Sequence, residues 1–173
     1  MKRDILTRYD ETAEGYEELY REEQELKYKT IMSKIHEKYE IVLDLGCGTG
    51  LFLKWLREIS KDVVGVDISK NMLRKAKQRD ANVILADAEN LPFREKVFDA
   101  VFAVTVLQLI PDKSKAFFEL LKTLKDKGLL VLSVIKAKEN SRHLIEQVSK
   151  AFKLIDVLDV ENVKDLIIFA AKR

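Results

Sequence analysis

Cysteine, histidine and proline are scarce in this chain of 173 residues. The only cysteine, Cys47, has no partner with which to form an internal disulfide. Neither of the two histidines, His36 and His143, has a zinc-like spacing to it, so we expect no metal site. The chain has only two prolines, and no Ser-, Gly- or Pro-rich linker or internal repeat divides it. We therefore expect a single domain over residues 1–173.

Long apolar runs and a strong charge of one sign are also missing. No stretch approaches the ~20 apolar residues that span a bilayer, and the first eight residues lack the apolar run of a signal peptide. The cytoplasm is therefore the expected location, and no membrane contact is expected. The net charge of +2 is too small to indicate nucleic-acid binding by itself.

From residue 41 onward, apolar stretches typical of strands alternate with amphipathic helical stretches. Strands are expected at 41–45, 63–66, 82–86, 98–104 and 129–135. Helices are expected at 51–60, after an N-cap at Ser69, from Pro111 to an end at Gly128, and around Leu144–Val148. The closing stretches, 152–160 and 163–171, are separated only by a turn and should pair antiparallel.

This alternation predicts an α/β fold. We expect a three-layer, Rossmann-like, doubly wound sheet of about seven strands, mostly parallel with an antiparallel C-terminal hairpin strand. Residues 1–40 are expected to form a helical lid over this core of residues 41–173. The apolar residues of that lid fall on one helical face: Tyr28, Ile31, Met32, Ile35 and Tyr39.

The most informative segment is 42–50, Val-Leu-Asp-Leu-Gly-Cys-Gly-Thr-Gly. A buried strand runs into glycines at alternate positions, and a helix start follows at Leu51. Such a turn has no side chains where a small ligand could lie on the backbone. The next two strands end at Asp67 and Asp87, so both carboxylates should lie on the same sheet edge as the turn. The carboxylate after the second strand can accept hydrogen bonds from both hydroxyls of a ribose. The carboxylate after the third can accept one from an exocyclic amine such as that of adenine, and together they predict an adenosine site.

Two classes of cofactor contain adenosine. Dinucleotide sites use Gly-x-Gly-x-x-Gly, which lets a pyrophosphate rest on the helix N-terminus. Here the spacing is Gly-x-Gly-x-Gly, and Leu51 follows. Asp44, just before the turn, would also repel a pyrophosphate, whereas it suits a ligand with an ammonium group and a sulfonium charge.

At these positions the chain resembles the class I S-adenosylmethionine-dependent methyltransferases, of the small, single-domain, type 11 kind. Residues 42–50 are similar to the first motif of that family, and Val66–Ser69 with Met72-Leu73 to the second. Residues 87–93 resemble the third motif, and residues 98–101, leading to Leu107 and Pro111-Asp112, resemble the fourth. The opening Tyr9-Asp10, with Ala13 and Tyr16, matches the start of the family's pattern.

The resemblance implies S-adenosylmethionine as the cofactor and a role for each matching position. Gly46, Gly48 and Gly50 would let the backbone approach the methionine part, and Asp44 would act on that end. Asp67 would hold the ribose hydroxyls, with Ile68 on the adenine. The remaining positions expected at the cofactor are the adenine readers Asp87 and Ala88, the carbonyl of Val104, the lid residues Tyr9 and Tyr16, and Cys47 and Met72 within the motifs.

No residue of the chain stands out as a catalytic base. Related enzymes often carry a histidine near Gln108 and Leu109, but neither of these positions nor Thr105 is a histidine here. The Asn/Asp-Pro-Pro-Tyr/Phe signature of amino-methylating enzymes is also missing. Methyl transfer to an already nucleophilic atom needs alignment more than a base.

The acceptor stays open between RNA, protein and a small molecule. Only residues 136–142 lie between the fifth strand and the next helix, so we expect an open site. An open site favours a large acceptor, such as RNA or protein, or completion by a partner protein or a second copy. The alternatives are a non-catalytic binding partner that keeps the cofactor fold and, third, an NAD-dependent dehydrogenase.

Overall fold

The computed structural model describes Thr7 and residues 15–136 and 138–173, with the backbone alone for Tyr16 and residues 138–140. The helices are α2 (Tyr16–Met32), α3 (Leu53–Leu56), α4 (Lys70–Lys77), α5 (Lys113–Thr123) and α6 (Lys138–Ala151), with a 3-10 turn η1 (Leu107–Leu109). The strands are β1 (Tyr39–Leu45), β2 (Ser60–Asp67), β3 (Val83–Leu85), β4 (Phe98–Ala103), β5 (Leu124–Ile135), β6 (Phe152–Asp159) and β7 (Asp165–Lys172).

These strands form one seven-stranded sheet in the order β3-β2-β1-β4-β5-β7-β6. The first five pair in parallel, and β7 pairs antiparallel with both β5 and β6. The predicted fold class and the closing hairpin are therefore confirmed. Strand order reverses between β1 and β4, the point at which open α/β sheets bind ligands beyond the carboxyl ends of their strands.

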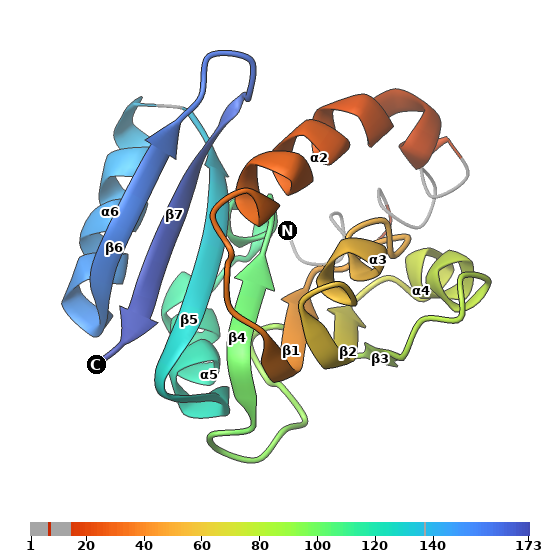
Figure 1. The fold of residues 1–173 in the computed structure, drawn as a ribbon, viewed down its shortest axis with the longest axis horizontal. Helices are drawn as coiled ribbons and strands as arrows, with labels where there is room; N and C mark the ends of the chain where they lie inside the picture. Colours follow the sequence, from red (N-terminus) through yellow and green to blue (C-terminus); the bar gives the residue numbers. More distant parts are fainter. Residues whose placement is uncertain (1–6, 8–14, 137) are drawn as a thin grey trace.

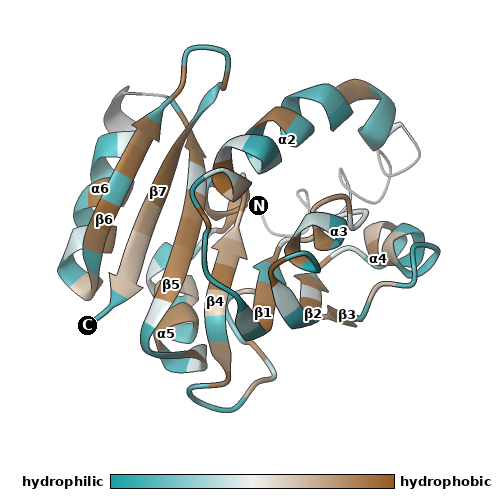
Figure 2. Cartoon of the chain, in the orientation of Figure 1, coloured by the Kyte–Doolittle hydropathy of each residue, from teal (hydrophilic) through white to brown (hydrophobic). Residues whose placement is uncertain are grey.

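Side chains alternate between the two faces of the sheet, and each face is covered by its own helices (Figure 1). Leu43, Val101 and Leu132 point to the side where α5 and α6 pack. Val42 and Phe102 point to the other side, against α2 and α3. Figure 2 shows the same division, with apolar colour along the strands and polar colour on the outer turns of α2 and α4. The result is the expected three-layer arrangement.

Ser69 begins α4 as predicted, because its hydroxyl accepts a hydrogen bond from the backbone N–H of Met72. Asp112 does the same for α5 through the N–H of Lys115. Both helices follow loops at the carboxyl edge of the sheet. These two caps therefore fix where α4 and α5 begin, after the end of β2 at Asp67 and after the loop that follows β4.

Four predicted boundaries were wrong. The connection expected over residues 136–142 is shorter, because α6 already begins at Lys138. The helix expected at 51–60 is a single turn at Leu53–Leu56, because Ser60 already belongs to β2 and pairs with Tyr39. The helix expected to end at Gly128 ends at Thr123, and β5 begins at Leu124 through an irregular pairing with β4. The lid helix ends at Met32, and Ile35 and Tyr39 join the same apolar cluster from the following loop and from β1.

Candidate functional site

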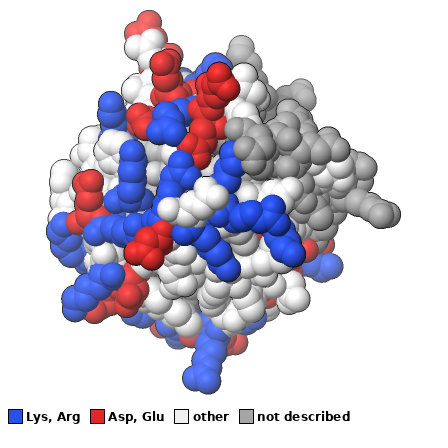
Figure 3. Space-filling model, turned by 90° about the vertical axis from the view of Figure 1, so that its right-hand side faces the viewer, with Lys and Arg blue, Asp and Glu red and all other residues white. Residues whose placement is uncertain are grey.

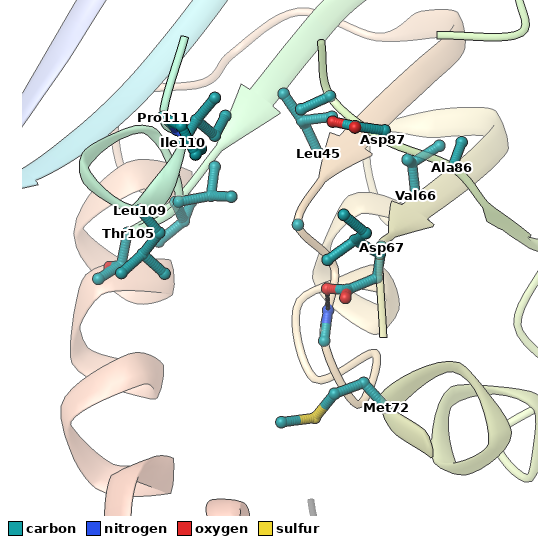
Figure 4. Close-up of a pocket in the computed structure, with 16 residues that line it drawn as sticks. Leu45, Val66, Asp67, Met72, Ala86, Asp87, Thr105, Leu109, Ile110 and Pro111 are labelled. Atoms are coloured by element: carbon teal, nitrogen blue, oxygen red, sulfur yellow. Dashed lines mark hydrogen bonds between the residues drawn. The ribbon is translucent and has the colours of Figure 1, made fainter. Parts of the chain in front are cut away.

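A cleft of about 830 Å³, counting the space open to solvent, lies at the carboxyl edge of the sheet. Figure 4 shows its two walls: Val66, Asp67 and Asp87 on one side, and Thr105 and Ile110 on the other. One wall comes from the ends of β1, β2 and the loop after β3, and the other from the loop after β4.

The glycine turn forms the floor between these walls. Gly46 and Gly48 have φ values of +74° and +52°, a conformation that side chains of L residues disfavour. At Gly46 an added Cβ would lie 2.5 Å from a methyl group of Val106, so the two loops touch there. At Gly48 nothing lies within 4 Å of the added Cβ. The floor is therefore bare backbone at that point.

Asp67 joins the turn to the helix that follows β2. One carboxylate oxygen accepts a 2.9 Å hydrogen bond from the N–H of Gly48, drawn dashed in Figure 4, and the other accepts one of 2.8 Å from Ser69. Asp87 accepts a hydrogen bond from the N–H of Glu89 at 3.0 Å. The two carboxylates thus have fixed positions at the ends of neighbouring strands, β2 and β3.

Asp44 lies in the sheet beneath the turn and is 2% exposed. Its neighbours across the sheet are Gly65 and Phe102, and one of its oxygens, Oδ2, has no hydrogen-bond partner among the described residues. Burial, and then the negative charge of Asp67, raises the pKa of Asp44 to about 8. A buried acid without a cation is costly, and a cationic ligand above it would relieve that cost.

Most of the predicted cofactor residues come together in this cleft. Those that line it are Gly46, Gly48, Asp67, Ile68, Met72, Asp87, Ala88 and Val104. Asp44, Cys47 and Gly50 lie behind the lining: Cys47 packs on Gly65, and Gly50 packs on Ala76. Burial raises the pKa of the Cys47 thiol well above its usual value. Tyr9 lies outside the described residues, and Tyr16 is described only as the first residue of α2.

The sequence did not single out the rest of the lining as cofactor positions. These residues are Leu45, Val66, Ala86, Thr105, Val106, Leu109, Ile110 and Pro111. Most belong to the loop after β4, and the position of that loop at the strand switch point is a signal that could have identified it. Among the described lining residues, the ionisable ones are Asp67 and Asp87.

Other residues that the sequence singled out lie away from the cleft. Asp99 accepts hydrogen bonds from the backbone N–H groups of Glu40 and Ile41 and pairs with Lys125. His143 is on the exposed side of α6, 3.1 Å from Gln147. Within the described part of the chain, no cluster of three or more His, Cys, Asp or Glu could hold a metal ion, and no helix could cross a membrane.

Comparisons with known proteins agree with this geometry. The family described as "Methyltransferase domain" matches residues 43–132. An uncharacterized protein of Methanocaldococcus jannaschii is 31% identical over 164 residues, which cover 92% of this chain and 78% of that protein. A malonyl-[acyl-carrier protein] O-methyltransferase of Buchnera aphidicola is 34% identical over 135 residues, 76% of this chain but only 53% of that enzyme.

The fold also matches solved structures. One is a chain from the complex between the Haloferax volcanii Trm112 methyltransferase activator and a methyltransferase. It superposes with a TM-score of 0.81 at 16% identity, covering 95% of this chain and 97% of that one. The family match spans residues from β1 to β5, including the glycine turn and both carboxylates of the cleft. The chain belongs to the family of class I S-adenosylmethionine-dependent methyltransferases.

Proposed function

We propose that this chain binds S-adenosylmethionine in the cleft and transfers the methyl group to a large acceptor. The observation that carries the proposal is the cleft itself: a bare glycine floor above the buried Asp44, next to a wall that carries the carboxylates of Asp67 and Asp87. We further propose that residues 1–173 act as one domain in which residues 1–40 serve as the lid and acceptor segment.

Each end of the cleft fits one part of the cofactor. Asp67 would accept hydrogen bonds from the ribose hydroxyls, while Ile68 and Met72 offer apolar surface to the adenine. Asp87 and Ala88 would read the adenine edge. The positive methionine end would lie over Gly46 and Gly48, near Asp44 and the carbonyl of Val104.

The reaction needs alignment more than proton transfer. The cofactor supplies a methyl carbon activated by positive sulfur, and the nucleophile displaces sulfur in line. The mostly apolar wall of Val104, Val106 and Leu109 would exclude water from that line. An acceptor atom that is already nucleophilic at neutral pH fits a cleft with this lining.

The first prediction concerns the choice of cofactor. Titration calorimetry on the pure protein should show micromolar binding of S-adenosylmethionine and S-adenosylhomocysteine. The turn has the spacing Gly-x-Gly-x-Gly and not the Gly-x-Gly-x-x-Gly that lets a pyrophosphate rest on the helix N-terminus. NAD should bind at least a hundredfold more weakly. Binding of NAD without binding of either sulfur compound would contradict the proposal and favour the dehydrogenase alternative.

The surroundings of the cleft favour a large acceptor. The end of β5 at Ile135 and the start of α6 at Lys138 are close in sequence, so this connection is too short to enclose a small acceptor. Among large acceptors the charge distribution favours RNA. Residues 70–79 contain five cations and no acid, and Figure 3 shows Lys and Arg gathered on this side of the molecule. In the described structure no carboxylate is within ion-pair distance of the exposed Lys70, Arg74 and Lys77.

A second prediction tests this acceptor surface. Reversing two charges of α4, in Arg74→Glu/Lys77→Glu, should reduce RNA binding at least tenfold at low salt, because each phosphate contact contributes through counterion release. The affinity for S-adenosylhomocysteine should not change. The matched control, Lys150→Glu/Lys153→Glu, reverses two exposed cations on the α6 and β6 side and should bind RNA like the unchanged protein. An equal loss of RNA affinity in both variants would contradict the proposal that RNA binds along α4.

Incubation of the protein with cofactor carrying a labelled methyl group and with separated cell fractions distinguishes the remaining alternatives. Label in RNA supports the proposal as stated, and label in protein moves the acceptor to that class. Label that appears only after a protein fraction is added indicates a site completed by a partner. Tight cofactor binding with no label in any fraction would favour the non-catalytic binding protein.

A further inference from the structure

A buried polar network lies directly behind the wall of the cleft and joins four parts of the chain. Lys27 of α2 places its ammonium 3.0 Å from the hydroxyl of Thr105, 3.1 Å from Glu23 and 3.2 Å from Asp165 at the start of β7. The hydroxyls of Thr105 and of Ser133 in β5 both donate to Asp165, at 2.8 and 2.7 Å. The network therefore connects α2 to the loop after β4 and to two strands of the sheet, β5 and β7.

The charges of this network balance. Lys27 and Asp165 have side chains that are 1% and 0% exposed, and the partly buried Glu23 pairs with the surface residue Lys164 at 2.6 Å. Burial alone would raise the pKa of Glu23, but hydrogen bonds from Lys164 and Lys27 lower it below its usual value. Two positive and two negative groups thus form a chain from the interior to the surface. The ammonium of Lys27 has three partners, one for each of its protons.

Thr105 is the point at which the network meets the cleft. Its φ of +57° is unfavourable for a β-branched residue, and such strain persists only where the surroundings enforce it. Its backbone N–H donates to the Ser133 hydroxyl at 2.8 Å, and its own hydroxyl contacts Lys27, Ser133 and Asp165. Val104 and Val106 on either side line the cleft, and Val106 is the residue that lies against Gly46.

We propose that Lys27, Ser133 and Asp165 are positioning residues for the cofactor: they hold Thr105 in its left-handed conformation and so set the wall that faces the glycine turn. The inference rests on the proposed function, because the ligand of this wall is the cofactor. It couples α2 to the cofactor site. A displacement of Lys27 removes support from Thr105, and a bound cofactor that fixes the wall favours the docked position of α2.

The main test uses Ser133→Ala, which removes the acceptor of the Thr105 N–H, changes no charge and does not alter the cleft lining. Calorimetry should show binding of S-adenosylhomocysteine about tenfold weaker. In the background of Thr105→Gly the same substitution should have no effect, because glycine adopts this φ without support. The reference for the double variant is Thr105→Gly alone, so that the test reads only the difference between these two proteins.

Controls separate positioning from stability and from the proposed function. Thr123→Ala removes a buried hydroxyl at the end of α5, just before β5 begins, and it should lower the melting temperature without changing the affinity. Unchanged affinity in Ser133→Ala, or an equal loss in the Thr105→Gly background, would overturn the positioning role. Failure of the unchanged protein to bind S-adenosylhomocysteine would instead overturn the proposed function.

Discussion

Replacing Asp67 with asparagine is expected to weaken S-adenosylhomocysteine binding about a hundredfold while the protein stays folded. The carboxylate would accept both ribose hydroxyls, and hydrogen bonds to a charged group contribute about 1.5–3 kcal/mol each. A loss of ~2.7 kcal/mol corresponds to about a hundredfold in Kd. Titration calorimetry with the variant at 25 °C measures this change directly.

Asp67 also has a structural role, so the experiment needs a control with the same chemistry. The Asp67 carboxylate accepts backbone N–H groups of Gly48 and Ser69, and asparagine can keep only one of these contacts. Asp99, away from the cleft, also accepts two backbone N–H groups, both on Oδ2, and its Oδ1 pairs with Lys125. Asp99→Asn makes the same change of atoms and removes the ion pair with Lys125, so it should lower stability and leave the Kd unchanged. An Asp67→Asn variant that binds within threefold of the unchanged protein would refute the ribose assignment.

Cofactor affinity is also expected to rise with pH, by roughly tenfold between pH 6 and 8. The pKa of Asp44 is about 8 in the unliganded protein, because of burial and then the charge of Asp67, so Asp44 is mostly protonated at pH 6. A ligand with a positive methionine end favours the ionised form, and binding should then release a proton. Calorimetry in buffers of different ionisation enthalpy measures that proton. In Asp44→Asn both the release and the pH dependence should disappear.

The raised pKa of Asp44 also predicts that the unliganded protein becomes less stable as the pH rises. The folded pKa of Asp44 lies above the ordinary aspartate value of 3.8, so protonation stabilises the folded state. That contribution is complete below pH 3.8 and is lost as the pH rises through about 8. The unliganded protein should lose roughly several kcal/mol of stability from this group over that window. Asp44→Asn should show a flatter dependence of melting temperature on pH, and an equal slope would contradict the assignment.

Local sequence signals predicted the parts of the fold that depend on local chemistry. The glycine spacing, the Ser69 cap and the turn between the last two strands each involve a few neighbouring residues. The helix expected at 51–60 was too long because its apolar spacing also suits a turn followed by a strand. The true boundary depends on the pairing of Ser60 with Tyr39, which no local pattern encodes.

The gathering of the glycines and acids at one edge of the sheet was predictable from the sequence. The polar network behind Thr105 was not. Glycines and acids after successive strands come to one edge by topology alone. The network at Thr105, in contrast, takes Lys27, Ser133 and Asp165 from distant segments. Each of these looks like an ordinary polar residue in its own stretch of sequence. The insertion of β7 between β5 and β6 brings Asp165 to Ser133, and the packing of α2 on the sheet brings Lys27 to Asp165.

That insertion has a consequence for the order in which the protein assembles. β6 pairs only with β7 in the sheet. Although β6 is synthesised first, it therefore has no strand to pair with until β7 is present. The two strands are close in sequence and can pair first as a hairpin, which then docks on β5 as a unit. Asp165 arrives with that hairpin. In that order of assembly, docking of the hairpin completes the support of the cleft wall. A nascent chain that lacks β7 would have the glycine turn without Asp165 behind its wall.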